Sequence, residues 1–451
     1  MNRHSVAYAR ILRWAPVAIF LLTVGVRGFL LARQPRELIL YGEAKSGGAA
    51  SLDEGINVAR SLVATRSFAD PFATPTGPTA HVPPSYPVTT AVIFLIFGTG
   101  LAGAVARNVL NIAGYGVLYA AAPSAATALR MGRPVGIIAG FMAAIYPACR
   151  STEVFRGRDE WLGAFILLWL TAIAFRFSGE PRWGWRSTLV YALGWGELMY
   201  INPSTVVVLP LHLLIAIVTH KQECLRTRLK HAGVVVFTMF LVILPWIVRN
   251  RITLGGWFFM RDNLGLELMV ANGEGSQPSQ AANQGTRWYW YTHPMGSPEA
   301  VRRIQRSGEL EFNRRALGAA AGWIMSHPDR FAWLTLRRFA FFWMDMPSNW
   351  LTFFLRGVLS VLCWVGIFIM WRERMFRQVA LLAAILLAYP IAYYFVQYSN
   401  RYVATLLFAL FLPSAYTLRT FMQFYLTAPA WLWFSKKRQV PRAQSLDTQC
   451  R

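Results

Sequence analysis

Long apolar stretches alternate with short basic connections along most of the chain. Ten stretches approach the roughly 20 residues that an α-helix needs to cross a bilayer. They lie at about 14–33, 108–129, 134–150, 161–177, 187–203, 204–219, 232–249, 350–371, 378–398 and 402–422. This pattern predicts an all-α polytopic membrane protein, a bundle of about ten transmembrane helices.

The first stretch differs from a cleaved signal peptide. Its apolar core is long, Arg27 interrupts it, and no A-x-A site follows it. Because a signal peptide has a short apolar region and a small-residue cleavage site, we expect this stretch to be a retained anchor.

The basic residues of the short connections indicate an orientation. Lys and Arg gather at the N-terminus and then in every second connection, near residues 130–133, 176–186, 221–230, 372–377 and 436–438. Short loops rich in Lys and Arg stay in the cytoplasm, so we expect both termini to be cytoplasmic. The long connections 34–107 and 250–349 then lie outside.

Residues 86–106 are apolar enough to be considered an eleventh span. Counting them would reverse the side of every later loop and place its basic residues outside. Phe97-Gly98-Thr99-Gly100 also interrupts the segment after about 12 apolar residues, a length more typical of an interfacial helix. We therefore expect a helix that lies at the outer face of the membrane.

Composition supports a membrane protein and removes one class of partner. The chain is 55% hydrophobic and 15% charged, and its 45 Lys+Arg against 21 Asp+Glu give a net charge of +24. Because the basic residues separate apolar runs and do not form one solvated face, we expect no nucleic-acid partner. The four cysteines are Cys149, Cys224, Cys363 and Cys450, and their positions indicate neither a disulfide framework nor a metal site.

The first outer loop contains a candidate catalytic carboxylate. Ser51-x-x-Glu54 precedes an amphipathic run, which predicts a short helix with Ser51 as its N-cap and Glu54 in a capping box. Alternatively, Glu54 is held at the membrane face to deprotonate an acceptor, and Asp53 is favoured by the helix dipole. A stiff run rich in proline follows and includes His81, and it suits the wall of a substrate cavity or a rigid turn.

The second outer connection, RSTEVFRGRDEW, concentrates charge at the mouth of two spans. Either it forms a solvated cluster of salt bridges, or Asp159 or Glu160 converges with Glu54 across one cavity while arginines such as Arg158 hold a phosphate. Further charges within or near the spans are functional candidates or side chains that snorkel to the interface, and His212 is expected in the core. These charges are Glu197, Arg27 and Arg356.

Two later segments also carry candidate chemistry. From Pro298 onward the pattern predicts two or three basic, aromatic helices that lie on the membrane. At the outer tip of the last hairpin, Arg401 stands beside Tyr402, where it is either a ligand for an anionic ester or a snorkelled residue of the interfacial belt.

The order of several short stretches resembles bacterial GT-C fold glycosyltransferases that use lipid-linked sugars, the superfamily of protein O-mannosyltransferases and aminoarabinose transferases. The resemblance is to a mostly uncharacterised branch and covers nearly the whole chain. Besides the Asp159-Glu160 pair, the stretches are LDEGINVARSLVATRSFADPF, TPTGPTAHVPPSYP, LMYINPS, LPWIVRN, RDNLGLELMVANG, HPMGSP, SGELEFNRRAL and SHPDRF.

The resemblance implies a glycosyltransferase of the bacterial inner membrane, with its active site on the outer face. The donor would be a polyprenyl-phosphate sugar, and the acceptor a protein, lipid or glycan. By position, the acidic catalytic residue of the first outer loop is Glu54 or its neighbour Asp53, and the second acidic site is Glu160 or Asp159. We expect an inverting transfer with Glu54 as general base.

The remaining assignments follow from this interpretation. Candidate ligands of the donor phosphate or substrate are Arg158, Arg249, Arg261, His81, Arg401 and Tyr402. No cofactor is required, and a divalent metal is compatible with two acidic loops although no ligand spacing demands one. Alternatives are a transporter or flippase of lipid-linked sugars and a non-catalytic scaffold of the cell envelope.

The expected domain organisation has four parts. They are a catalytic transmembrane module at 1–249 with the outer loop 34–107, an outer loop with interfacial helices at 250–349, C-terminal transmembrane helices at 350–422, and a basic cytoplasmic tail at 423–451.

Overall fold

The protein is an all-α polytopic membrane protein. The computed structural model describes residues 3–34, 39, 53–147, 158–177, 179 and 183–427. Six helical segments among them are long and apolar enough to cross a membrane. They are α1 (Arg3–Ala32), α5 with α6 (Leu101–Ala120 and Ala122–Ala128), α8 (Glu160–Phe177), α11 (Leu225–Leu254), α18 (Trp350–Arg372) and α19 with α20 (Phe376–Ala388 and Ile391–Phe395).

The other expected spans are helical but shorter or interrupted. They are α7 (Arg133–Ile145), α9 (Trp185–Ile201), the 3-10 turn η2 with α10 (Pro203–Val207 and Val208–Thr219), and α21 with α22 (Asn400–Ala404 and Leu407–Thr427). Each of the ten predicted stretches therefore contains a helix, and the number that crosses the membrane stays a prediction.

The segment 86–106 is interrupted at Gly98, as the sequence indicated, and its two parts belong to two different helices. Helix α4 (Ser85–Phe97) ends at Gly98, whose φ of +78° is a left-handed conformation that favours glycine. Helix α5 then begins at Leu101, so its first turns were wrongly assigned to the interfacial helix. Helix α5 continues through Arg107, which is buried and donates a hydrogen bond to the Tyr86 hydroxyl.

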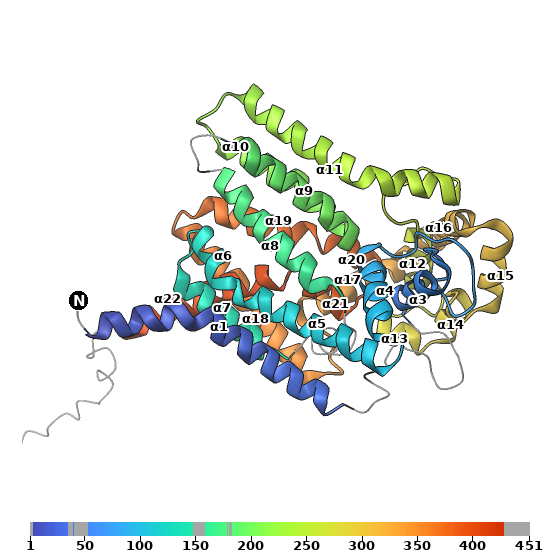
Figure 1. Ribbon diagram of the computed structural model, residues 1–451, viewed down its shortest axis with the longest axis horizontal. Helices are drawn as coiled ribbons and strands as arrows, with labels where there is room; N and C mark the ends of the chain where they lie inside the picture. Colours follow the sequence, from blue (N-terminus) through green and yellow to red (C-terminus); the bar gives the residue numbers. More distant parts are fainter. Residues whose placement is uncertain are drawn as a thin grey trace, which may run out of the picture.

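Short helices gather at one end of the bundle (Figure 1). They are α3 (Glu54–Thr65), α12 (Leu264–Ala271), α13 (Gln280–Gln284), α14 (Arg287–Thr292), α15 (Pro298–Ser307) and α16 (Glu309–Ser326), followed by α17 (Pro328–Met344). Three helices thus follow from Pro298 onward, within the expected two or three, and their location on the membrane stays a prediction. A small core that includes Phe72, Val270 and Phe312 joins this layer to the first long loop.

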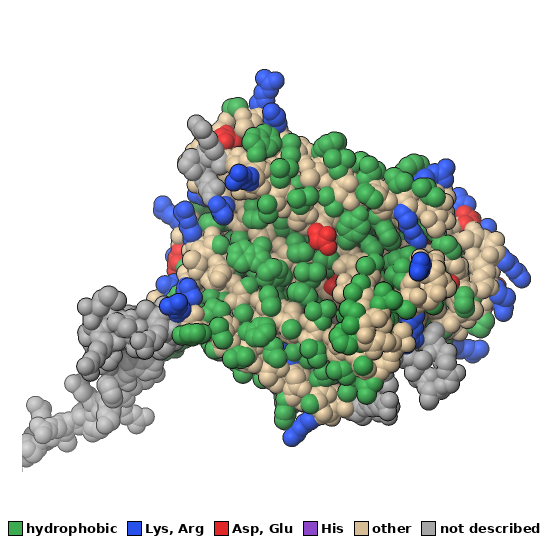
Figure 2. Space-filling model, in the orientation of Figure 1, with side chains coloured by type: hydrophobic (Ala, Val, Ile, Leu, Met, Phe, Trp, Pro, Cys, Tyr) green, Lys and Arg blue, Asp and Glu red, His purple; other side chains and the backbone are tan. Residues whose placement is uncertain are grey.

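The surface and the core agree with a membrane location. Figure 2 shows a broad apolar face with Lys and Arg mainly at its two ends, as expected of a surface in contact with lipid. Inside, α18 and α22 approach so closely that an added Cβ at Gly366 would lie 2.0 Å from the Pro413 carbonyl oxygen. Close approach through small residues is a typical way for membrane helices to associate.

Two arginines in the predicted spans do not snorkel. Arg27 is 2% exposed and donates to the carbonyl oxygens of Ala144 and Ala143, whereas Arg356 is fully buried and donates to the Tyr398 hydroxyl. Both charges are satisfied inside the protein, because carbonyl and hydroxyl acceptors on neighbouring segments reach them.

The remaining polar residues of the spans meet different outcomes. Glu197 is exposed. His212 lies in the core, as expected, with its Nε2 3.2 Å from the Leu381 carbonyl oxygen. Cys224 and Cys363 are free thiols, while Cys149 and Cys450 lie outside the described residues.

Candidate functional site

One cavity collects most of the residues that the sequence singled out. It lies where α3, α8, α12 and α21 meet at the end of the bundle that carries the short helices. Its lining includes the predicted residues Glu54, His81, Arg158, Asp159, Glu160, Arg261, Arg401 and Tyr402. Segments separated by more than 300 residues thus converge on one site, and Asp53 and Arg249 lie outside the lining.

Asp53 supports the cavity from behind. It is the N-cap of α3, where its Oδ1 accepts hydrogen bonds from the backbone N–H groups of Gly55 and Ile56 at 3.0 and 3.2 Å. The N-cap is thus Asp53 and not the predicted Ser51, which lies outside the described residues, and Glu54 is the first residue of the helix and not the fourth residue of a capping box. A short carboxylate directly before the first helical residue is the better acceptor for the free N–H groups.

The second oxygen of Asp53 is also occupied. Its Oδ2 accepts hydrogen bonds from Nε and Nη2 of Arg158 at 3.0 and 2.6 Å. Burial alone would raise the pKa of Asp53, but the charge and hydrogen bonds of Arg158 outweigh it and lower that pKa. Asp53 is thus held as an anion that pairs with Arg158. For this reason it is poorly suited to remove a proton.

Glu54 faces the cavity directly. Its Oε1 lies 3.9 Å from His293 Nε2, and its side chain is 18% exposed. Burial first, and then the charge of Asp53, raise the pKa of Glu54. A carboxylate with a raised pKa beside a cavity matches the requirement for a general base better than Asp53 does.

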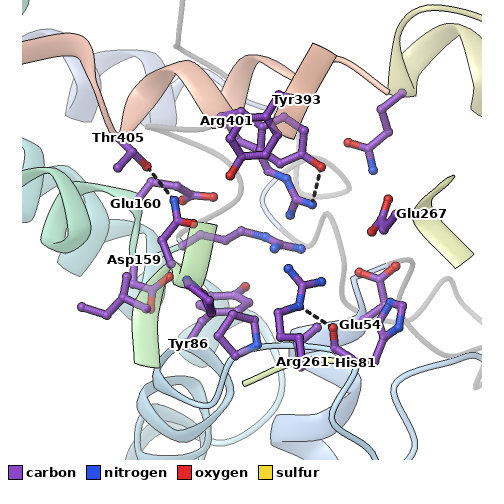
Figure 3. Close-up of a pocket in the computed structure, with 18 of the residues that line it drawn as sticks. Glu54, His81, Tyr86, Asp159, Glu160, Arg261, Glu267, Tyr393, Arg401 and Thr405 are labelled. Atoms are coloured by element: carbon purple, nitrogen blue, oxygen red, sulfur yellow. Dashed lines mark hydrogen bonds between the residues drawn. The ribbon is translucent and has the colours of Figure 1, made fainter. Parts of the chain in front are cut away.

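Asp159 and Glu160 form a second acidic pair at the start of α8 (Figure 3). Asp159 Oδ2 and Glu160 Oε2 are buried and have no hydrogen-bond partner among the described residues. Burial, followed by the charge of Glu160, raises the pKa of Asp159 to about 7. These oxygens are therefore available to a substrate hydroxyl or amine.

Three guanidinium groups share the cavity with these acids. Figure 3 shows that Arg261 and Arg401 extend into it from opposite sides. Arg261 Nε donates to the His81 carbonyl oxygen at 2.8 Å, and Arg401 Nη2 donates to the Tyr402 hydroxyl at 3.3 Å. Arg401 Nε is buried without a partner among the described residues, so part of its donor capacity is free for an anion. Arg158, the third, lies over the Tyr86 ring at 5.1 Å.

Arg249 does not reach the cavity. Its Nη1 donates to the Thr79 carbonyl oxygen at 2.7 Å and its Nη2 to the Phe68 carbonyl oxygen at 3.0 Å. The guanidinium also lies 4.9 Å from the centre of the Trp246 ring. The structure thus places Arg249 as a support of the proline-rich loop, outside the lining of the cavity.

A residue that the sequence did not single out supports the same loop. Glu309, at the start of α16, accepts hydrogen bonds from Thr79 Oγ1 at 2.6 Å and from the Ala80 N–H at 2.7 Å. Burial, followed by the charge of Asp262, raises its pKa well above the usual range. Together with Arg249 and Arg261, Glu309 fixes the backbone that carries His81 into the cavity.

Several lining residues lacked a local signal. They are Tyr86, Asn202, Glu267, Gln280, Tyr289, His293, Tyr393, Gln397 and Thr405. Asn202, Glu267 and His293 belong to the stretches LMYINPS, RDNLGLELMVANG and HPMGSP, so the resemblance marked their neighbourhoods. The stretches alone did not indicate which side chain points into the cavity. That depends on the turns and short helices at one end of the bundle, which we call the outer layer.

One group of side chains in the described part of the chain has the geometry to hold a metal ion. Glu54, His81 and His293 each offer a ligand atom, and these atoms lie within 4.8 Å of one another. This is not the pair of acidic loops expected from the sequence, since two of the three side chains are imidazoles. Burial lowers the pKa of His293 to about 3 and that of His81 well below its usual value, so both rings are neutral and able to bind a cation.

Comparison with known proteins identifies the fold of the chain. No family model matches the chain, and no curated protein shows significant sequence similarity to it. Among solved structures, it is similar to the Archaeoglobus fulgidus oligosaccharyltransferase in complex with Zn and sulfate (15% identity, TM-score 0.50, covering 93% of this chain and 51% of that chain). It is also similar to the apo form of that enzyme (14%, 0.51, 92% and 51%).

A third similar structure is the archaeal oligosaccharyltransferase AglB of Archaeoglobus fulgidus with an inhibitory peptide and a dolichol-phosphate (12% identity, TM-score 0.50, covering 96% of this chain and 53% of that chain). The chain spans about half the length of these proteins, and identities this low speak to the fold alone. The helical bundle and its outer layer therefore have the GT-C fold of these oligosaccharyltransferases.

Proposed function

We propose that the protein is a membrane glycosyltransferase that moves a sugar from a polyprenyl-phosphate carrier to an acceptor on the outer face of a bacterial cytoplasmic membrane. The observation that carries the proposal is the cavity. Its lining brings Arg158, Arg261 and Arg401 together with carboxylate oxygens of Asp159 and Glu160 that have no hydrogen-bond partner among the described residues. Cations for a phosphate and a carboxylate for an acceptor proton are what such a transfer requires.

The similar structures support this choice of donor. One of them is AglB in complex with a dolichol-phosphate, a lipid phosphate of the kind proposed here. The apolar face of the bundle would give the carrier chain of such a donor access from the bilayer (Figure 2).

The reaction assigns separate tasks to the two groups. The three arginines bind the phosphate and stabilise the negative charge that it gains as the bond from its oxygen to the anomeric carbon breaks. A carboxylate takes the proton of the acceptor while the acceptor atom bonds to the anomeric carbon from the opposite face, so the configuration inverts.

Two carboxylates are candidates for the base. Glu54 is the residue indicated by position in the sequence, and Asp159 has a pKa of about 7, close to the value at which a base works best near neutral pH. Asp53 is excluded by its bonds to α3 and Arg158, both of which need its charge or its lone pairs.

The test is transfer or hydrolysis of radiolabelled polyprenyl-phosphate sugars by the purified protein in liposomes. We expect release of sugar from at least one donor, and a loss of about 100-fold or more in Arg401→Ala and in whichever of Glu54→Gln and Asp159→Asn removes the base. Glu274→Gln is the matched control, because that side chain is 78% exposed and far outside the lining.

Two results contradict the proposal. One is the absence of any turnover with a panel of donors that differ in sugar and in carrier length. The other is full activity of both Glu54→Gln and Asp159→Asn. Movement of intact donor across the bilayer without cleavage would instead identify a flippase.

A further inference from the structure

Arg401 reaches the cavity with little support from its own hydrogen bonds. Its Nη2 donates to the Tyr402 hydroxyl at 3.3 Å, and its Nε is buried with no hydrogen-bond partner among the described residues. A long side chain with few bonds loses much conformational freedom when it binds an anion, unless its backbone is already held in place. The position of Arg401 therefore depends on what fixes the start of α21, whose first turn carries it.

Tyr398, three residues before Arg401, ties the chain to the outer layer. Its backbone N–H donates to the Pro278 carbonyl oxygen at 2.9 Å, and its carbonyl oxygen accepts from the Gln280 N–H at 2.8 Å. Its ring packs edge to face against Phe341 of α17, with 6.1 Å between the ring centres. Both the backbone and the ring of Tyr398 are thus fixed directly before α21 begins.

The Tyr398 hydroxyl joins three further side chains. It accepts a hydrogen bond from Arg356 Nη1 at 2.6 Å, and as a donor it lies 3.1 Å from Asp345 Oδ1 and 2.5 Å from Asn400 Oδ1. Arg356 and Asp345 also face each other, with Nη2 3.7 Å from Oδ2. Because Asn400 is the first residue of α21, one hydroxyl connects that helix to α18 and to the turn between α17 and α18.

Holding these groups together costs folding free energy. Arg356 is 0% exposed and Asp345 2%, and for two buried charges the loss of hydration can exceed their mutual attraction. Asp345 also has a φ of +69°, a left-handed conformation that is unfavourable for a residue with a Cβ. None of Arg356, Asp345 and Tyr398 lines the cavity. The network therefore does not touch a substrate there, and what it fixes is the chain that leads to Arg401.

We propose that Tyr398, held by Arg356 and Asp345, is a positioning residue for Arg401. This inference rests on the proposed function, in which Arg401 binds the phosphate of the donor. With the start of α21 fixed in advance, less conformational entropy is lost when the guanidinium binds the phosphate. A role of Tyr398 in the fold alone would lower binding whether or not Arg401 is present.

The test is a double-mutant cycle of Tyr398→Phe, Arg401→Ala and the two together. The purified full-length protein is titrated with a polyprenyl monophosphate in detergent micelles, and with the phosphate-free polyprenol as the reference ligand. We expect the affinity for the phosphate to fall about 10- to 100-fold in Arg401→Ala and about three- to tenfold in Tyr398→Phe. The double variant should lose no more than Arg401→Ala alone, and the affinity for the polyprenol should stay unchanged.

Tyr416→Phe is the matched control. Tyr416 is also a buried tyrosine, 4% exposed, whose hydroxyl donates to a carboxylate, that of Glu373 at the far end of α18. Its variant should bind the polyprenyl monophosphate as tightly as the wild type. Should Tyr398→Phe fail to fold, Asp345→Asn takes its place in the cycle. Asparagine tolerates a positive φ and keeps an acceptor for the Met346 N–H, while it removes the charge opposite Arg356.

The binding assay needs no turnover, so it separates this inference from the proposed function. If the wild type prefers the phosphate and the cycle is non-additive but no sugar is transferred, the positioning role stands and the proposed function fails. The inference is overturned if the wild type does not prefer the phosphate to the polyprenol, or if Tyr398→Phe binds as tightly as the wild type. It is also overturned if the losses of the two single variants multiply in the double variant, even when the wild type transfers sugar.

Discussion

Glu309 and Arg249, which support the proline-rich loop, differ in what they bond from Asp159, Glu160 and Arg401, which line the cavity. Behind the loop, Glu309 receives two hydrogen bonds and Arg249 donates to two carbonyl oxygens. Inside the cavity, Asp159 and Glu160 each keep an oxygen that has no partner in the described part of the chain, and Arg401 Nε has none there either.

The difference separates support from chemistry. A buried polar group whose hydrogen bonds are all satisfied stabilises the folded state compared with a variant that has lost its partner. Such a group has no free donor or acceptor for a substrate. A buried polar atom without a partner costs folding free energy, so its presence at a cavity indicates a ligand that completes it. Substitutions of the supporting residues should therefore mainly change stability, and substitutions of the cavity residues should mainly change activity.

The largest effect is expected at Asp159. Asp159→Asn removes a general base and should lower kcat for transfer by about 10²- to 10⁴-fold, while the Tm stays level or rises because a costly buried carboxylate is gone. Kinetics and thermal unfolding on the same preparation measure both. A variant with normal kcat and a lower Tm would place Asp159 on the supporting side instead.

Asp53 should show the opposite behaviour with an effect almost as large. Asp53→Ala removes the N-cap of α3 and leaves buried Arg158 without its anion, a loss of about 3–5 kcal/mol in the free energy of unfolding. Asp53→Asn keeps the cap oxygen but places an amide N–H₂ against the Arg158 guanidinium, so it separates the loss of the cap from the loss of the ion pair. Equal stability of both variants with the wild type, measured by denaturant unfolding, would contradict the assignment of Asp53 as a support.

These two aspartates also show how far the sequence reaches. The Asp53-Glu54 and Asp159-Glu160 pairs were recognised as acidic sites because each stands beside an apolar stretch, in a loop that the sequence predicts to be outside. Within each pair the roles depend on one hydrogen bond or one helix boundary. Asp53 caps α3 only because the helix begins at Glu54, and a pattern of polar and apolar residues locates such a boundary to within a few residues at best.

The fold and the site differ in the same way. Period and charge predicted the long helices, their order and the break near Gly98, since these depend on local composition. The cavity depends on contacts between distant segments, such as Thr79 with Glu309, 230 residues apart. His293 was missed for this reason. Its role arises where the outer layer folds back on the first loop, and a lone histidine in HPMGSP carries no sign of that contact.

Glu309 extends the comparison to a smaller effect. Glu309→Gln keeps one acceptor oxygen but places an amide N–H₂ against a donor, so we expect a loss of about 1–3 kcal/mol in stability and a modest rise in KM, with kcat nearly unchanged. The control is Glu311→Gln on the same helix, whose carboxylate is 26% exposed and is paired with the exposed Arg314 and Arg315, and its Tm should hardly move. A fall in kcat as large as that of Asp159→Asn would show that Glu309 takes part in the chemistry.

A change of pH should have opposite signs for activity and for stability. The pKa of Asp159 is raised to about 7 in the folded protein, so the folded state binds this proton more tightly than the unfolded state, whose pKa is near 3.8. The contribution to stability is complete below about pH 4 and is lost as pH rises toward 7, whereas a base gains activity over the same range, by up to about tenfold per pH unit. If Asp159 is the base, kcat should rise to a plateau near pH 7 as the Tm falls, and Asp159→Asn should flatten both curves. A kcat profile of unchanged shape in Asp159→Asn would assign the titration to another group, with Glu54 the first to examine because burial and the charge of Asp53 also raise its pKa.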